Sequence, residues 1–329
     1  MPDFSTEHID RGLTNLSLMY VNADFAAPMI FPRLPVQKRS DKYYIYGRET
    51  ALMPSGLDGN GRALSLLLPG GEAREVSYSL STDFFHAEKY AKKELITFDD
   101  IAYQDEPLNI DIDATINVTQ QLFLDREMMV NALVGNASNY ATNNKKTLVT
   151  TTTSWAAYSS ATSLPMTDIQ QSKKPIIQGI IKPPNKFAVS YQVAYVLSEH
   201  PTYKDEFKYV SMANLTASGL LPNIKGLDVV ELMTQQNTGD VWLDTANSNP
   251  FALSYYASNE VGPRSVHFGR IFNAPDARSG ARDISIRKYL WEIKNGYYVE
   301  GAMTEDYKFP RQHSNGKAVG GFLFSNPIV

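Results

Sequence analysis

The chain has 329 residues, of which 43% are hydrophobic and 20% charged, and its formal net charge is -4. This length suffices for one elaborated domain or two ordinary ones, and the composition excludes a wholly disordered protein. A sequence pI near 5.8 argues against the basic field of a nucleic-acid-binding protein. The absence of cysteine excludes a disulfide framework and a thiolate metal site, and it fits folding in a reducing cytoplasm.

The sequence also lacks the usual signs of export or membrane insertion. Its amino terminus, MPDFSTEHID, carries acidic residues and has neither the basic nor the apolar region of a secretory signal. No run approaches the ~18 apolar residues that a membrane helix requires. We therefore expect no secretion and no membrane contact.

Residues 1–40 combine several aromatic residues with prolines at positions 2, 28, 32 and 35. Because proline fixes φ and biases the preceding residue toward extended backbone, this stretch is typical of an arm rather than a compact unit. An arm with this much apolar surface needs something to pack on. That surface belongs either to a neighbouring subunit, which is the simpler interpretation, or to the arm's own domain.

Two β-type stretches could pair as a long hairpin: residues 42–48 read KYYIYGR, and residues 74–80 alternate as REVSYSL. The intervening residues contain glycines and prolines at a density that predicts a long tip instead of a tight turn. Four leucines within residues 64–68 lie near the end of this tip. Docking on a neighbouring subunit explains them better than exposure to water, and the alternative is a lid folded back on its own core.

The strongest helix signal spans residues 111–135. Its apolar positions follow steps of three and four, acidic residues begin it, and Gly135 occupies the position of a carboxyl-terminal cap. Such a helix would be roughly 37 Å long, about twice the usual length, which indicates a spine along one edge of a flat subunit. Residues 84–96, FFHAEKYAKKELI, are predicted to be helical or mixed, with a solvated face of lysines.

Downstream of the long helix the pattern changes from helical to β-type. Residues 136–163 are rich in Ser, Thr and Asn and predict a connection. The elements expected after it are a helix at 166–181 ended by PPN, a strand at 186–191, short helices at 192–197 and 204–209, and several strands from residue 227 onward. The sequence has no internal repeats, and its predicted strands and helices do not alternate regularly as they do in βαβ units. We therefore expect an α+β fold.

Nothing in the sequence carries the pattern of an enzyme. The histidines, His8, His86, His200, His267 and His313, are scattered, and no HExxH, GxSxG or Walker-type sequence is present. The acid pairs at 99–100 and 111–113 are typical of helix starts, where the helix dipole favours carboxylates. The GLDGNG stretch lacks the strand and helix that a phosphate loop requires. We expect no enzyme activity, no cofactor and no metal.

The stretch ADFAAPMIFPRLPVQKRSDKYYIYGRET, residues 23–50, resembles the opening of tailed-phage major capsid proteins of the Hong Kong 97 fold. That opening has an apolar arm, a Phe-Pro with a following Pro, and a strand like SDKYY. The later order is similar too: EVSYSLSTDFFHAEKYA, PLNIDIDATINVTQQLFLDRE, LVTTTTSW, DIQQSKKPI and PPNKFAVSYQVAYVLSEHP. The resemblance covers roughly residues 23–201 and depends on this ordered set, and the last third is similar only in its β-rich character.

The resemblance implies a specific division of the chain. The expected parts are an N-terminal arm at 1–40, an extension loop at 41–82, a peripheral domain at 83–182 with its spine helix at 111–135, an axial domain at 183–282, and return strands with a C-terminal tail at 283–329. In that family the extension loop lies across the adjacent subunit. The residues expected to make inter-subunit contacts are Phe25, Phe31, Tyr43, Tyr44, Leu66, Leu67, Leu68 and Arg74.

The function that the resemblance implies is structural: self-assembly into hexamers and pentamers of an icosahedral shell around packaged double-stranded DNA. The chain would be assembled in the host cytoplasm and reside in the virion capsid. Expected partners are other copies of the chain, a separate scaffolding protein and a portal, with a decoration protein left open and only nonspecific contact with DNA. A separate scaffold is expected because the arm starts within ~20 residues of Met1.

Two alternatives remain open on the sequence. An encapsulin-type nanocompartment shell protein would share the fold and enclose a cargo enzyme. Another virion structural protein, from the tail or a minor component, could also have a β-rich second half, although the long spine helix argues against it. Some members of the capsid family join subunits by a lysine–asparagine isopeptide bond, and no matching residue set is found here, so we expect none.

Overall fold

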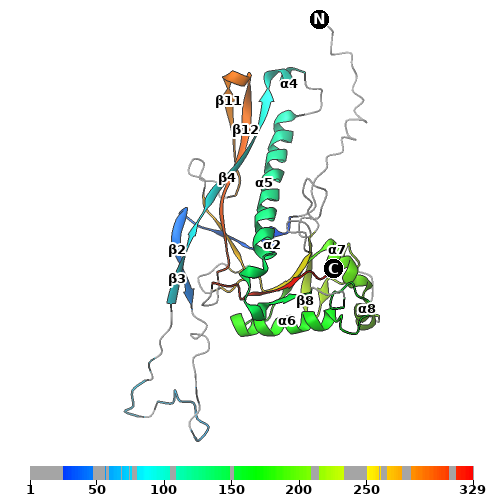
Figure 1. The fold of residues 1–329 in the computed structure, drawn as a ribbon. Helices are drawn as coiled ribbons and strands as arrows, with labels where there is room; N and C mark the ends of the chain where they lie inside the picture. Colours follow the sequence, from blue (N-terminus) through cyan, green and yellow to red (C-terminus); the bar gives the residue numbers. More distant parts are fainter. Residues whose placement is uncertain are drawn as a thin grey trace.

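The computed structural model shows an elongated molecule built from two β-sheets, a long helix and a projecting hairpin (Figure 1). The structure describes residues 25–46, 56, 59–67, 69–73, 75, 80–103, 109–148, 152–208, 215–232, 250–258, 260, 265–275, 283–310 and 316–328. Helices and strands occur together without alternating regularly along the chain. This arrangement confirms the α+β class.

The first sheet has the order β1-β10-β12-β11, and β4 pairs with the other edge of β12. Its strands are β1 (Arg33–Pro35), β4 (Glu88–Thr97), β10 (Arg270–Asn273), β11 (Ser285–Trp291) and β12 (Gly296–Lys308). Only the pairing of β1 with β10 is parallel among these described strands. Helix α5 (Ile110–Val134) lies along one face of this sheet, and the short helix α4 (Phe98–Ala102) lies at its far end (Figure 1).

The second sheet has the order β5-β13-β9-β6-β8-β7 and carries the shorter helices. Its strands are β5 (Lys145–Thr147), β6 (Lys186–Ser190), β7 (Asn223–Ile224), β8 (Leu227–Leu232), β9 (Phe251–Tyr255) and β13 (Gly321–Ser325). The helices beside it are α6 (Pro165–Ile180), α7 (Tyr191–Glu199) and α8 (Pro201–Phe207), whose buried residues share one core with the sheet. The described residues also form three short 3-10 helices: η2 (Ala137–Asn139), η3 (Thr142–Asn144) and η5 (Glu292–Lys294).

A two-stranded hairpin, β2 (Ser40–Tyr46) with β3 (Leu80–His86), projects from the side of the first sheet (Figure 1). Its antiparallel register pairs Ser40 with His86 and Tyr46 with Leu80. The expected hairpin is therefore present, and its described returning strand begins at Leu80, the last residue of the stretch predicted for it, while residues 74 and 76–79 lie outside the described residues.

Helix α5 agrees with the prediction within one residue at each end. The side chain of Asn109 caps its first turn by accepting a hydrogen bond from the backbone N–H of Ile112, at 3.3 Å. Asp111 and Asp113 follow in that turn, where the helix dipole favours negative charge. The face toward the first sheet is lined by Ala114, Val118 and other apolar residues.

Helix α6 also matches its prediction, although it ends for a different physical reason. The residue after it, Ile181, adopts the left-handed conformation with φ 62°, and its N–H donates to the carbonyl of Ile177. The chain therefore leaves the helix before it reaches the prolines at 183 and 184.

The prediction that residues 84–96 are helical or mixed is wrong. They form the end of β3 and most of β4, and β4 pairs with ten residues of β12 from Gly296 to Glu305. Backbone hydrogen bonds to this central strand outweigh the helix propensity of the Ala, Lys, Glu and Leu residues in the segment.

The two sheets divide the chain differently from the expected domain limits. Helix α6 was expected within the peripheral domain at 83–182, and its buried residues share a core with the second sheet. Strand β10 was expected within 183–282 and lies in the first sheet, whereas β13, expected to return with 283–329, completes the second sheet. One hydrophobic cluster contains residues from α5, from both sheets and from the arm, so the sheets form one body.

Candidate functional site

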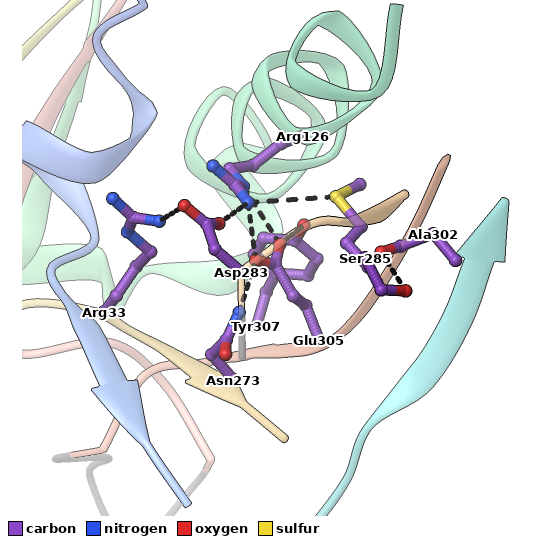
Figure 2. A network of polar contacts seen from close by, with 9 residues as sticks. Arg33, Arg126, Asn273, Asp283, Ser285, Ala302, Glu305 and Tyr307 are labelled. Carbon is purple, nitrogen blue, oxygen red and sulfur yellow. Dashed lines mark hydrogen bonds and ion pairs between the residues drawn. The ribbon is translucent and has the colours of Figure 1, made fainter. Parts of the chain in front are cut away.

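A buried network of charged and polar side chains ties α5 to the first sheet (Figure 2). The guanidinium of Arg126 donates from Nε to Glu305 Oε2 at 3.0 Å and from Nη2 to Glu305 Oε1 at 2.7 Å. Its Nη2 also lies 3.1 Å from Asp283 Oδ1, and the other oxygen of Asp283 lies 2.5 Å from Arg33. Arg126 and Glu305 are both almost fully buried. Four segments of the chain therefore meet at one ion-pair network.

Electrostatics favours the charged forms of this network. Desolvation lowers the pKa of Arg126, but Glu305 and Asp283 more than offset this effect and the net shift is upward. Burial by itself would raise the pKa of Asp283. Arg33 and Arg126 together lower it by more than burial raises it, so the net shift is downward. Glu305 also accepts hydrogen bonds from the hydroxyl of Tyr307 at 2.7 Å and the amide of Asn273 at 3.0 Å. The carboxylate is saturated, so the network serves to hold elements together.

A second acidic residue of α5 fastens the arm. Glu127 is fully buried, and its Oε1 accepts a hydrogen bond from the backbone N–H of Ala27 at 2.6 Å. Its Oε2 has no hydrogen-bond partner among the described residues. Burial raises the pKa of Glu127 to about 7, although the N–H of Ala27 and the charge of Arg126 act in the opposite direction. The contact joins α5 to the start of α2 (Ala27–Ile30).

The base of the hairpin is fixed by stacked aromatic rings. Phe85 of β3 stacks on Phe272 of β10 with ring centroids 4.7 Å apart, and Tyr43 of β2 lies 5.1 Å from the same ring. The hydroxyl of Tyr43 donates to Asp83 at 2.7 Å, across the hairpin. The hairpin is thus anchored at one end by Phe272, while its outer part extends away from the body (Figure 1).

The residues that were predicted to contact a neighbouring subunit differ in how exposed their side chains are. Tyr44 is 60% exposed on the hairpin, and Leu66 and Leu67 are 54% and 56% exposed beyond it, so all three are accessible. Phe25 and Tyr43 are half-buried against their own chain. Leu68 and Arg74 lie outside the described residues.

The prediction for Phe31 needs correction. Its side chain is fully buried, and its ring packs against Phe268 and Phe309 with centroids 5.7 and 5.4 Å apart. It also covers Gly269, where an added methyl group would overlap the ring. Phe31 therefore belongs to the core of its own subunit and presents no surface to a neighbour.

A second apolar surface was not predicted from the sequence. It lies at the far end of the first sheet, beside α4, and we call it the distal patch: Phe98, Tyr103, Leu290, Trp291 and Ile293. Ile293 is 86% exposed, in the η5 turn between β11 and β12. The available signal was an isoleucine within the turn sequence EIKNG, where polar residues are usual.

The buried side chain of His200 has a structural role. His200 Nε2 lies 3.1 Å from Ser163 Oγ, a pairing that could suggest a nucleophile with its base. However, the Ser163 hydroxyl donates to the carbonyl of Ser154 at 2.7 Å, so its proton points away from the imidazole. His200 Nδ1 accepts from the backbone N–H of Thr202, and burial lowers the pKa of the ring. The group is hydrogen-bonded on both sides inside the fold.

Within the described residues, no three His, Cys, Asp or Glu side chains gather in a way that could hold a metal ion. In the same part of the chain, no helix combines the length and apolarity needed to cross a membrane. Among the described residues, exposed apolar side chains lie on the hairpin, in the loop beyond it and in the distal patch.

Comparison with known sequences finds phage proteins. The chain is 28% identical over 194 residues to the major capsid protein of Pseudomonas phage JBD67, and 27% identical over 216 residues to that of Burkholderia phage BcepMu. The aligned regions cover 59% and 66% of this chain, and they span 57% and 66% of the two relatives. No family model matches the sequence.

Comparison with solved structures extends over nearly the whole chain. A phage-related protein of Bordetella bronchiseptica RB50 superposes with a TM-score of 0.66 at 18% identity, covering 97% of both chains. A chain of the capsid structure of cyanophage P-SCSP1u gives a TM-score of 0.58 at 12% identity over 93% of this chain and 89% of that one. The holo-SrpI encapsulin of Synechococcus elongatus gives 0.53 at 10% identity over 96% and 95%. The chain therefore has the Hong Kong 97 fold, and its sequence is similar to those of two phage major capsid proteins.

Proposed function

We propose that this chain is the major capsid subunit of a tailed bacteriophage, assembling into hexamers and pentamers of an icosahedral shell around double-stranded DNA. The observation that carries the proposal is the agreement of two independent comparisons. Sequence relatives are phage major capsid proteins, and the full-length structural match includes a phage capsid. The proposed location is the virion capsid.

The shape of the subunit supports this role physically. A stable interface buries on the order of 800 Å² on each partner, and a subunit of a closed shell needs several such interfaces. The projecting hairpin and the distal patch add accessible apolar surface at separated points of the molecule (Figure 1). Several modest contacts made at once produce a cooperative ring or shell.

We further propose roles for the parts of the subunit. The first sheet with α5 would be the peripheral domain, and the second sheet with α6, α7 and α8 the axial domain, in place of the sequence-based limits. The hairpin, with exposed Tyr44, Leu66 and Leu67 on and beyond it, would be the extension loop that contacts an adjacent subunit. The apolar exposure of these residues supports that assignment.

An encapsulin-type shell is the second candidate, because the fold match to an encapsulin covers 96% of this chain. The sequence relatives favour the phage capsid instead. The near-complete structural coverage makes a tail or minor virion protein the weaker interpretation. A separate scaffolding protein, a portal, a decoration protein and nonspecific contact with packaged DNA remain proposed partners.

The proposal is tested by particle formation. The purified chain, alone and co-expressed with a candidate scaffolding protein, is examined by sedimentation and electron microscopy. Closed shells or rings of six and five subunits are expected in at least one preparation, and a stable monomer in both would overturn the proposal. Purified shells that contain a specific enzyme instead of DNA would favour the encapsulin alternative.

A matched pair of variants tests the extension-loop assignment. Leu66→Ser with Leu67→Ser removes exposed apolar surface and should reduce shell yield while leaving the subunit folded. Ser65→Ala lies in the same exposed loop and should assemble as the unsubstituted chain does. Equal yields from both variants would remove these leucines from the proposed interface.

A further inference from the structure

Two arginine side chains in the described part of the chain are almost fully buried, and they differ in their partners. Arg126 is 3% exposed and forms ion pairs with Glu305 and Asp283. Arg270, the first residue of β10, is 4% exposed and forms no ion pair with any described residue. A buried cation without a counter-ion is unfavourable, because burial removes the water that would otherwise solvate it.

The hydrogen bonds of Arg270 leave one of its terminal nitrogens without an acceptor. Its Nη2 donates to the carbonyl of Glu260 at 2.7 Å and to the hydroxyl oxygen of Ser265 at 3.1 Å, and it also contacts Nε2 of His267. Its Nη1 is buried and has no hydrogen-bond partner among the described residues. Because Nη1 carries two N–H groups, this side chain brings two unsatisfied donors into the interior.

The buried ring of His267 adds a further donor to this cluster. Its Nδ1 accepts from the backbone N–H of Ser258 at 3.3 Å, so the neutral ring carries its proton on Nε2. That nitrogen lies 3.1 Å from the carbonyl of Glu260, the same oxygen that accepts from Arg270. Two side chains therefore share one neutral acceptor, and donors outnumber acceptors.

Electrostatics shows the same excess of positive charge. Burial lowers the pKa of Arg270 to about 10. Burial also lowers the pKa of His267 to about 4, the charges of Arg270 and Lys182 act in the same direction, and the hydrogen bond to the Glu260 carbonyl opposes them. At Arg126, by contrast, two carboxylates more than offset the effect of burial. A negative charge beside Arg270 would have the corresponding effect.

The cluster lies close to the surface of the subunit. Glu260 is exposed and Ser265 is half-buried. Lys182 is exposed as well, and its ammonium group lies 3.4 Å from the hydroxyl of Tyr256. The carbonyl of Tyr256 accepts from the backbone N–H of Phe268, the neighbour of His267, at 2.9 Å. An exposed cation therefore stands beside two buried donors.

The chemistry of these groups selects the class of ligand. A guanidinium group binds oxyanions such as phosphate through charge-assisted hydrogen bonds. An oxyanion offers several acceptor oxygens to a cluster that has too few, and it brings the negative charge that the cluster lacks. Because Nη1 is buried, a small free ion fits it better than the backbone of a polymer.

We propose that Arg270 and His267, with Lys182 at the rim, form a binding site for a small oxyanion of the phosphate type. The ion accepts from Nη1 of Arg270 and compensates its charge. The site is distinct from the Arg126 network, in which carboxylates of the chain itself have this role. It belongs to the single subunit, so it does not depend on shell formation.

Calorimetric titration of the unassembled full chain with inorganic phosphate, at an ionic strength held constant with chloride, measures binding directly. The parent should bind one phosphate per subunit. Arg270→Gln removes the cation and should weaken binding at least about tenfold. Arg287→Gln is the matched control, because it removes an exposed arginine that has Glu300 as its partner, and it should bind phosphate as the parent does.

Thermal unfolding provides a second measurement. Phosphate stabilises many proteins by its general effect on the solvent, and that effect is common to parent and variants. Specific binding adds a saturable rise in the midpoint temperature of the parent, which Arg270→Gln should lose and Arg287→Gln should keep. No binding to the parent, or equal affinities of the parent and Arg270→Gln, would overturn the proposal.

A rim variant keeps the proposal testable where Arg270→Gln does not fold. Lys182→Gln changes an exposed side chain and should weaken phosphate binding about threefold, because it removes a nearby charge without removing the buried donors. An unchanged affinity in this variant would contradict the site as described. A short DNA duplex should not displace the phosphate, and displacement would refute the assignment to a small free ion.

Discussion

Replacing Glu127 by glutamine should change how the stability of the subunit depends on pH. Burial raises the pKa of this carboxyl group from 4.5 to about 7 in the folded state. Below the pKa of the unfolded state, Glu127 is protonated in both the folded and the unfolded protein, so the stabilising contribution of its raised pKa is fully present. Between the two values stability falls by about 1.4 kcal/mol per pH unit, and above about pH 7 the loss is complete.

The pKa difference sets the size of the effect. A shift from 4.5 to about 7 corresponds to a loss of roughly 3 kcal/mol above pH 7, which glutamine avoids because it cannot ionise. Its carbonyl oxygen can still accept from the N–H of Ala27. Its amide nitrogen replaces Oε2, which has no partner among the described residues, and it buries two donors where the protonated carboxyl group buries one, so the additional donor costs about 1–3 kcal/mol. The variant should therefore be less stable than the parent at pH 4.5 and equally or more stable at pH 8.

Urea denaturation of the unassembled subunit, followed by circular dichroism at several pH values, measures the effect. The difference between parent and Glu127→Gln is the informative quantity, because the other titrating groups are common to both proteins. Gln121→Ala, which changes an exposed side chain of the same helix and removes no ionisable group, is the control and should give a difference that is nearly constant with pH. Parallel curves for Glu127→Gln, within about 1 kcal/mol from pH 4.5 to 8, would refute the reasoning.

Three further substitutions test the framework by denaturation or hydrogen exchange. Arg126→Met leaves Glu305 buried without its cation and should lower the free energy of unfolding by about 3–5 kcal/mol. Adding Glu305→Met should recover much of that loss. If the effects of the two substitutions simply add in the double variant, the two residues are not coupled. Gly296→Ala brings a methyl group against the backbone of β4 and should lower the free energy of unfolding by about 1–3 kcal/mol. Gly59→Ala is the control, because its added methyl group meets open space, and it should change the free energy of unfolding by less than about 0.5 kcal/mol. Phe272→Ala removes the ring on which the base of the hairpin stacks. Amide hydrogen exchange should then be faster in β2 and β3 than in β6. Equal exchange rates in these strands would argue against local anchoring of the hairpin.

Local patterns predicted the helices well and the first-sheet strands poorly. The long helix was placed within one residue because its cap, its acidic first turn and its periodicity all lie within the segment itself. The segment at 84–96 has the composition of a helix, and its strand conformation depends on β12, some 200 residues away.

The candidate contact residues show a second limit of sequence reasoning. Phe31 and Tyr44 are both aromatic residues in an apparently extended region, yet one is fully buried in its own subunit and the other is largely exposed. Hydrophobicity indicates that a surface must be covered, but it does not say which chain covers it. The distal patch was missed because a single isoleucine in a turn is a weak signal.

The position of β13 has a consequence for the order of events during synthesis. This strand, residues 321–325, inserts between β5 at residues 145–147 and β9, so the second sheet remains divided until it is available. At about 5–20 residues per second, translation from β5 to β13 takes roughly 10–40 s. During that interval β5 and the edge of β9 lack their shared neighbour. The second sheet of a nascent subunit can therefore reach its final strand order only late in the translation of this sequence.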